Sequence, residues 1–197
     1  MEVSPRAGIT VARLVEAAAD LADEVGLENV TVSALARRFG VADASLYSHV
    51  RSAADLRQRV SALAAVEFSE VLAEAIAGVS GDEALTRCAL AFRRYVFEHP
   101  GRYAATTVRL PPEVAAASEG HRRIALLSYR LLEGYDIPPG ELTDAVRFCR
   151  SALHGFVTLE AAGGLGPEGD REASWLATLR GVGRALASWP CGDGPGS

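Results

Sequence analysis

The chain has 197 residues, of which 49% are hydrophobic and 23% are charged. This composition is typical of a folded protein, and it excludes an intrinsically disordered chain. The net charge of -5 argues against indiscriminate nucleic-acid binding, so any affinity for DNA has to come from a local surface. No segment approaches the roughly 18 apolar residues of a membrane span, and the N-terminus lacks the apolar core of a signal peptide. We therefore expect a cytoplasmic protein.

The first predicted helix covers Ile9 to Val25, and Gly26 ends it. Its apolar residues recur at intervals of three and four, which places them on one face of a helix. This stripe is suited to brace the two helices that follow. Its members are Leu14, Ala18, Leu21 and Val25.

A shorter helix is predicted from Val32 to Phe39. Thr31 is suited to cap it, because a threonine hydroxyl accepts a hydrogen bond from the first turn of a helix. Gly40 supplies the permissive backbone that ends it. The helix is one-sided, with its apolar residues three and four apart: Val32, Leu35, Ala36 and Phe39.

The segment from Asp43 to Val50 is predicted as a third helix, joined to the second by a glycine turn. Leu46 and Val50 share one face of it and leave the other face polar. In a helix-turn-helix, the second helix enters the major groove of DNA, and small polar side chains near its start permit a close approach to base edges. The two helices therefore predict a DNA-reading helix-turn-helix. The exposed residues are Ser45, Tyr47, Ser48 and His49.

The charge around this segment is positive but modest. Between Ala36 and Val60 five arginines stand against Asp43 and Asp55, which gives a local charge of +3. A solvated face of mixed charge has the same composition, so the charge alone does not decide between the two interpretations.

Strand-like alternation of polar and apolar residues is absent from the rest of the chain, which predicts an all-α fold. Glycines and prolines separate the helices, and Asp82 and Asp170 are suited to cap two of them. The glycine-rich connection 163–169 lacks the Lys-Ser/Thr of a phosphate-binding loop. The tail 190–197 is expected to be disordered. Helices are predicted at 54–77, 83–98, 103–109, 118–134, 141–162 and 171–189.

The last two helices each carry an apolar stripe at heptad-like spacing. Two such helices suit a four-helix seam between two copies of the chain, and packing against their own domain explains the same stripes equally well. Because a palindromic operator needs two readers at a fixed spacing, a dimer is expected. The stripes are Leu142, Val146, Cys149, Leu153 and Val157, and Leu176, Leu179, Val182, Gly183 and Leu186.

The first 60 residues resemble the DNA-binding domain of the TetR/AcrR family of bacterial transcriptional regulators. The resemblance rests on the amphipathic first helix, the capping Thr31, the Ala-rich Ser33 to Phe39, Gly40-Val41, and Leu46-Tyr47-Ser48-His49-Val50. Arg150 to Glu160, with its His154-Gly155 pair, and His99-Pro-Gly-Arg-Tyr103 further resemble a subgroup with a His-Gly pair in its C-terminal domain. Arg150 stands where that subgroup has Trp.

This resemblance implies that Tyr47 and His49 lie against phosphates, with Ala44, Ser45 and Ser48 nearer the bases and Ser33 at a second backbone contact. The family's phosphate-binding Lys is Ala53 here, and the chain contains no Lys, so Arg51 and Arg57 are the available substitutes. Ala42 replaces the usual cap of the third helix, so Asp43 is expected to cap it, to sit in its first turn, or to accept a hydrogen bond from a cytosine. The expected DNA-binding set is Thr31, Ser33, Arg38, Asp43, Ala44, Ser45, Tyr47, Ser48, His49 and Arg51.

The resemblance also implies a DNA-binding domain at 1–53 and a helical regulatory and dimerisation domain at 54–189. We expect the dimer interface at Val146, Leu153, Val157, Leu176, Leu179, Val182 and Leu186. A family fold would bring aromatic residues around a central ligand pocket, although such residues are more often plain core. The candidates are Phe92, Tyr95, Tyr103, Tyr129, Phe148, His154 and Trp175.

These patterns predict a dimeric transcriptional regulator, a repressor that a small molecule releases from a palindromic operator. One alternative is a regulator of the same fold that binds no ligand or binds a protein. Another is a small α-helical hydrolase using Ser151 and His154, which lacks a nucleophile elbow and a placed acid.

No spacing predicts a metal site or a cofactor. The cysteines Cys88, Cys149 and Cys191 form no CxxC pair, and we expect them to be reduced, inert thiols.

Overall fold

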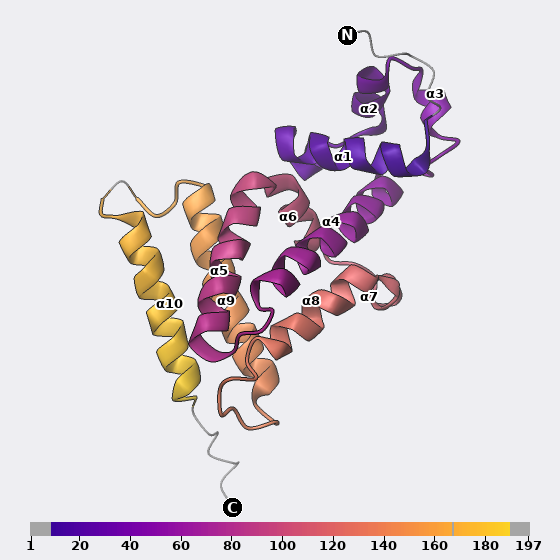
Figure 1. Ribbon diagram of the computed structural model, residues 1–197. Helices are drawn as coiled ribbons and strands as arrows, with labels where there is room; N and C mark the ends of the chain where they lie inside the picture. The colour runs from indigo at the N-terminus through magenta and orange to yellow at the C-terminus, as the bar shows by residue number, and fades with distance from the viewer. Residues whose placement is uncertain (1–8, 167, 190–197) are drawn as a thin grey trace, which may run out of the picture. The chain divides into compact units, whose positions relative to one another are not determined.

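The computed structural model describes residues 9–166 and 168–189, so the tail 190–197 lies outside the described residues. Within these ranges every regular element is a helix and no strand occurs, which confirms the all-α prediction (Figure 1). No helix in the described part is long and apolar enough to cross a membrane.

The chain forms two compact units that are interleaved in sequence. The N-terminal unit comprises the residues up to Glu67 together with His99–His121, and the C-terminal unit comprises Phe68–Glu98 and the residues from Arg122 onward. Two of their three boundaries fall inside α4 (Ala53–Ala75) and inside α8 (Glu119–Arg130), and the third lies between Glu98 and His99. These units differ from the contiguous ranges 1–53 and 54–189, because the segment that begins at His99 packs with the first helices.

The first helix of the N-terminal unit begins at a side-chain cap. Thr10 Oγ1 accepts a hydrogen bond from the Arg13 N–H at 3.3 Å and starts the first helix. The start of α4, described with the site below, also belongs to this unit. Its other elements are α1 (Val11–Val25), the 3-10 turn η1 (Leu27–Asn29), α2 (Val32–Phe39), α3 (Asp43–Leu46), α6 (Pro100–Thr107) and α7 (Pro112–Ala117).

One apolar core holds this unit together. The face of α1 that includes Leu14 and Ala18 is fully buried, as predicted, while Leu21 is half-buried and Val25 is exposed. Ala105 of α6 lies in the same core, although it is far away in sequence. The core includes Leu14, Val15, Ala18, Ala22, Val30, Leu35, Leu46, Val50, Leu56, Val60 and Ala105.

The backbones of α1 and α6 touch. A Cβ placed on Gly101 would overlap the carbonyl carbon and oxygen of Ala22 and crowd the backbone nitrogen of Asp23. Only a glycine fits at this point. Gly101, the second residue of α6, therefore fixes how closely the segment after His99 approaches α1.

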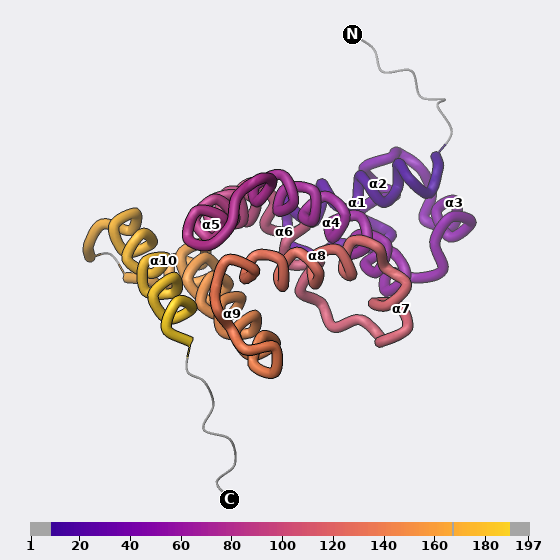
Figure 2. The backbone as a smooth tube through the Cα atoms, turned by 60° about the horizontal axis from the view of Figure 1, so that its bottom comes forward, coloured from indigo at the N-terminus to yellow at the C-terminus, as the bar shows by residue number. Residues whose placement is uncertain are grey.

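The core of the C-terminal unit lies between three long helices, which pack against one another in pairs. These are α5 (Gly81–Glu98), α9 (Leu142–Ala161) and α10 (Arg171–Ala187), seen side by side in Figure 2. Asp170 caps α10 as predicted, because its carboxylate accepts hydrogen bonds from the N–H groups of Glu172 and Ala173. The core includes Leu85, Ala89, Phe92, Leu132, Cys149, Val157, Trp175, Leu179 and Leu186.

Several predicted boundaries were wrong. Asp82 lies in the first turn of α5 and does not cap it. The helix expected at 103–109 begins at Pro100, since a proline is well tolerated at the first position of a helix. Helix α7 was not predicted, and the third helix ends at Leu46 instead of Val50.

Replacing Gly101 by Ala is expected to destabilise the protein by about 3 kcal/mol, because the new Cβ must push the backbones of α1 and α6 apart. The sign of the change in the free energy of unfolding distinguishes this position from an open helix site, where Gly→Ala stabilises by about 1 kcal/mol. Urea unfolding measures the difference. The control is Gly140→Ala in the turn before α9, where nothing lies within 4 Å of the added Cβ. Equal stability of the two variants would contradict the close packing.

Candidate DNA-binding surface

The turn between α2 and α3 has the predicted geometry. Thr31 Oγ1 accepts a hydrogen bond from the Ala34 N–H at 3.1 Å and caps α2. Gly40 adopts the left-handed conformation, with φ 67° and ψ 33°, and Val41 N–H donates to the Ala36 carbonyl at 3.0 Å. This arrangement satisfies the last carbonyls of α2 and sets the direction in which α3 leaves.

The start of α3 is held by a hydrogen bond to α2 that was not predicted from the sequence. Ala42 makes no side-chain cap, and Asp43 lies in the first turn, one of the three roles expected for it. Its carboxylate accepts a hydrogen bond from the Ser33 hydroxyl of α2. Two residues expected to contact DNA therefore bind each other and join the two helices.

The residues that follow present an exposed polar surface anchored by two buried side chains. Leu46 and Val50 are buried, and the N–H groups of His49 and Val50 both donate to the Leu46 carbonyl. Tyr47 is 56% exposed, and His49 is half-buried. Ala44, Ser45 and Ser48 are also exposed, and the Ser48 hydroxyl donates to the Ser45 carbonyl at 2.8 Å.

Most arginines near this surface are paired within the chain. Arg38 Nη1 donates to Glu24 of α1 at 2.7 Å, and its Nη2 lies 4.0 Å from Asp20. Arg57 donates to the Val30 carbonyl at 3.5 Å, and Arg59 pairs with Asp55 at 3.2 Å. Within the described part of the chain, this leaves two exposed guanidinium groups without a hydrogen bond or ion pair: Arg37 and Arg51.

A capping box fixes the start of α4 and the loop that carries Arg51. Ser52 Oγ accepts a hydrogen bond from the Asp55 N–H at 3.1 Å, and the Asp55 carboxylate accepts one from the Arg51 N–H at 3.0 Å. The Arg51 hydrogen bond, opposed by partial burial and supported by Arg59, lowers the pKa of Asp55. The Ser-x-x-Asp spacing was a visible signal for this box.

A buried arginine joins α6 to α1 and α4. The side chain of Arg102 is only 9% exposed and pairs with Asp20 at 2.8 Å, with Glu67 at 3.1 Å and with Asp23. Burial raises the pKa of Glu67, against the opposing charge of Arg102. Since Asp20 also faces Arg38, the cluster links α6 through α1 to α2. No local pattern in the sequence predicts this cluster of ion pairs, because the partners lie far apart along the chain.

The residues expected to bind a ligand lie in different surroundings. Tyr103 belongs to the N-terminal unit, while Tyr129 and Phe148 are 38% and 39% exposed. His154 is half-buried, and burial followed by the charge of Arg150 lowers its pKa. The remaining three are buried and make ring contacts: Phe92 and Tyr95 with Phe68 at 5.9 and 4.9 Å, and Trp175 with Phe156 at 5.0 Å.

Most residues expected at a dimer interface are buried inside their own unit. Val146 is half-buried, and Leu176 is 39% exposed. The other five pack within the same chain, as the alternative interpretation of the stripes allowed, so their side chains are not on the surface: Leu153, Val157, Leu179, Val182 and Leu186.

The two described cysteines are buried and protonated. Burial raises the pKa of both Cys88 and Cys149 to about 12, which leaves almost no thiolate at neutral pH. Among the described residues, no group of His, Cys, Asp and Glu is arranged to hold a metal ion.

The DNA-binding geometry and the sequence agree with two family profiles. Residues 14–60 match the bacterial regulatory proteins of the tetR family, and residues 85–182 match a tetracyclin repressor-like C-terminal domain. The chain belongs to the TetR family of transcriptional regulators. Its helix-turn-helix is therefore a DNA-binding element, as predicted.

Two curated relatives of this TetR-family regulator are themselves regulators of the helix-turn-helix type. The chain is 39% identical over 157 residues to Rv0681 of Mycobacterium tuberculosis, which covers 76% of this chain and 69% of the relative. It is 28% identical over 159 residues to YobS of Bacillus subtilis, which covers 81% of this chain and 83% of the relative. Both likenesses are to transcription regulators.

Solved structures share the fold of this TetR-family chain at low sequence identity. The regulator SCO7222, a TetR from Streptomyces coelicolor, has a TM-score of 0.69 at 20% identity, with 92% of this chain and 99% of that chain covered. A protein from Rhodococcus sp. RHA1 has a TM-score of 0.75 at 20% identity, with 94% and 100% covered. The His-Gly subgroup stays a prediction.

Replacing Asp55 by Asn is expected to lower the free energy of unfolding by about 1 kcal/mol at neutral pH, because the capping box loses its charged acceptor. The folded-state pKa of Asp55 is lowered, so its contribution is present above its ordinary value of 3.8 and is lost as the pH falls through the folded value. The gap between wild type and Asp55→Asn should therefore close in acid. Denaturant unfolding from about pH 7 downward measures it, with Glu113→Gln, an exposed acid of α7, as the control. A gap independent of pH would refute this role.

Proposed function

We propose that this TetR-family regulator is a homodimeric repressor that binds a palindromic operator and is released from it by a small molecule. The observation that carries the DNA-binding part is the exposed surface of Ser45, Tyr47 and Ser48, held by buried Leu46 and Val50. This arrangement presents the hydrogen-bonding groups of exposed side chains on a backbone that the buried side chains hold in place.

Base contacts are assigned to the small side chains and phosphate contacts to the larger ones. Ala44, Ser45 and Ser48 allow the backbone to approach the base edges in the major groove closely. Tyr47 and His49 carry hydrogen-bonding groups at the end of longer side chains, which suits phosphate oxygens. Arg51 follows directly and adds an exposed guanidinium that forms no hydrogen bond or ion pair within the described residues.

The remaining residues of the expected set act differently. The hydroxyl of Thr31 is used as a helix cap, and Ser33 binds Asp43, so both support the turn and offer at most a second hydrogen bond to DNA. Arg38 contacts a phosphate only by leaving Glu24 and Asp20. These two acids therefore reduce the electrostatic attraction of the surface, which makes a single reader weak.

Weak single readers favour a dimer, and the outer faces of α9 and α10 suit one. Gly155 and Gly181 are interior to their helices, and a Cβ on either would meet nothing within 4 Å in the same chain. An interior glycine costs a helix about 1 kcal/mol relative to Ala, and a second copy that packs closely there would explain both. Phe148 and Leu159, which are 39% and 51% exposed, lie on the outer face of α9.

The effector is proposed to be apolar or amphipathic and to bind in the aromatic region of the C-terminal unit. Trp175 is fully buried, and its Nε1 has no hydrogen-bond partner within the described structure. A buried donor without a partner is costly, so a bound water or a polar group of a ligand would satisfy it. His154 offers a further polar group that stays neutral at physiological pH, since its pKa is lowered.

Tyr47→Ala and His49→Ala are each expected to weaken operator binding by about tenfold across all sequences, because a hydrogen bond to a charged group is worth about 1.5 kcal/mol. Ser45→Ala and Ser48→Ala should change the sequence preference instead. Electrophoretic shift titrations against the upstream region of the gene, at several salt concentrations, measure both effects. Phe97→Ala, at an exposed aromatic residue of the C-terminal unit, is the control. Identical behaviour of the two pairs would contradict the assignment.

Gly181→Trp is expected to convert the protein into a monomer, because a large side chain would block close packing of α10 against a second copy. The helical circular dichroism should be unchanged, since the position is open within one chain. Sedimentation equilibrium gives the association constant, and Ala116→Trp, at an exposed site of α7, controls for added apolar surface. A Gly181→Trp protein that dimerises as strongly as wild type would exclude this face.

A further inference from the structure

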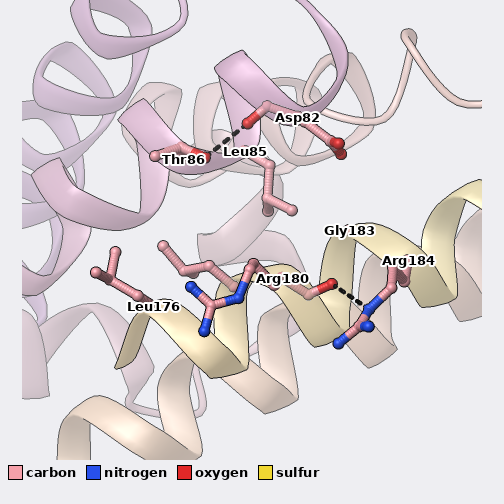
Figure 3. A pocket seen from close by; sticks show the side chains of 8 residues that line it. Asp82, Leu85, Thr86, Leu176, Arg180, Gly183 and Arg184 are labelled. Atoms are coloured by element: carbon pink, nitrogen blue, oxygen red, sulfur yellow. Dashed lines mark hydrogen bonds between the residues drawn. The ribbon is translucent and has the colours of Figure 1, made fainter. Parts of the chain in front are cut away.

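A groove of about 300 Å³ lies in the C-terminal unit between the first turns of α5 and one side of α10 (Figure 3). It is separate from the aromatic residues considered above for the effector, none of which lines it. This volume stands at the lower end of the range for small-molecule pockets, roughly 300–1,000 Å³. The groove therefore suits a small molecule better than a peptide.

The inner walls of the groove are apolar. Leu85 points from α5 toward α10 (Figure 3). Leu179 of α10 also lines the groove. These two side chains are 2% and 5% exposed, so they form a firm floor. Leu176 is 39% exposed at one end of the groove and extends the apolar surface outward.

The α10 side of the groove carries two guanidinium groups. Arg180 and Arg184 are one turn apart, and Arg184 Nε donates to the Arg180 carbonyl at 3.3 Å. Neither guanidinium forms an ion pair within the described residues. By contrast, Arg93 in the same unit pairs with Glu160 and Glu172, both at 2.6 Å. Acidic residues outnumber basic ones in this chain, whose net charge is -5, and yet neither guanidinium is paired with one of them in the described part of the chain. Both guanidinium groups are therefore available to an external anion.

The opposite wall limits the charge of that anion. Asp82 Oδ1 accepts a hydrogen bond from the Tyr135 hydroxyl at 2.7 Å, and a Cβ on Gly183 would come within 2.9 Å of the same oxygen. This carboxylate is therefore fixed at the groove by Tyr135. One acid facing two arginines leaves a net charge of +1, which favours a monoanion over a phosphate dianion.

We propose that this groove binds a small aliphatic monocarboxylate. The carboxylate accepts hydrogen bonds from Arg180 and Arg184, and the hydrocarbon chain lies on Leu85, Leu179 and Leu176. The site is independent of the DNA-binding surface, and the proposal does not require that its occupant be the effector.

The test measures the binding of sodium octanoate to the full-length protein by isothermal titration calorimetry. The comparison ligands are octan-1-ol, which has the chain without the charge, and inorganic phosphate, which has the charge without the chain. We expect octanoate to bind at least about tenfold more tightly than either. Equal binding of octanoate and octanol, or no binding of octanoate, would overturn the proposal.

Variants locate the site. Arg180→Gln is expected to weaken octanoate binding by about tenfold, and Arg184→Gln should weaken it in the same direction, because each removes a charged donor. Arg171→Gln, on an exposed arginine of α10 outside the groove, is the matched control. Thermal unfolding and circular dichroism confirm that the variants are folded. Unchanged octanoate binding by folded Arg180→Gln, or an equal loss in Arg171→Gln, would show that the carboxylate binds elsewhere.

Discussion

The buried guanidinium of Arg102 is the interaction on which the DNA-reading unit depends. It brings together acids from α1 and α4, and the neighbouring Gly101 lets the backbone of α6 touch that of α1. Acids this close would repel one another without the cation, and a buried cation without acids would be strongly destabilising. The helices that support the helix-turn-helix are therefore held together by a charge from α6, a segment far along the chain.

The same cluster limits how strongly the unit attracts DNA. Asp20 and Glu24 occupy Arg38, and Asp55 occupies Arg59, so the positive charge counted along the sequence is only partly available to phosphates. Phosphate contacts supply much of the affinity of DNA-binding proteins and make it dependent on salt. In the proposed homodimer, affinity rests on the exposed Tyr47 and its neighbours and on the pairing of two readers.

The parts of the fold that the sequence predicts are local ones. Thr31, Gly40 and Leu46 could be assigned because caps, turns and helix periodicity depend on residues a few positions apart. The Arg102 cluster, the Ser33–Asp43 contact and the pairing of Arg38 were missed, since they join separate helices. The stripes of α9 and α10 show the same limit. Periodicity identifies a buried face, but it does not say whether the same chain or a second copy buries it.

Unpaired arginines acquire meaning from what surrounds them. Several exposed arginines in this chain have no acidic partner in the described structure, and most of these are solvated surface. Arg51 differs because it follows an exposed tyrosine and a histidine on a loop fixed by a capping box. Arg180 and Arg184 differ because they border buried leucines in a groove. In both places a cation that forms no ion pair within the described residues lies beside a second recognition element. This suits an extended polyanion in the first case and a small amphipathic anion in the second.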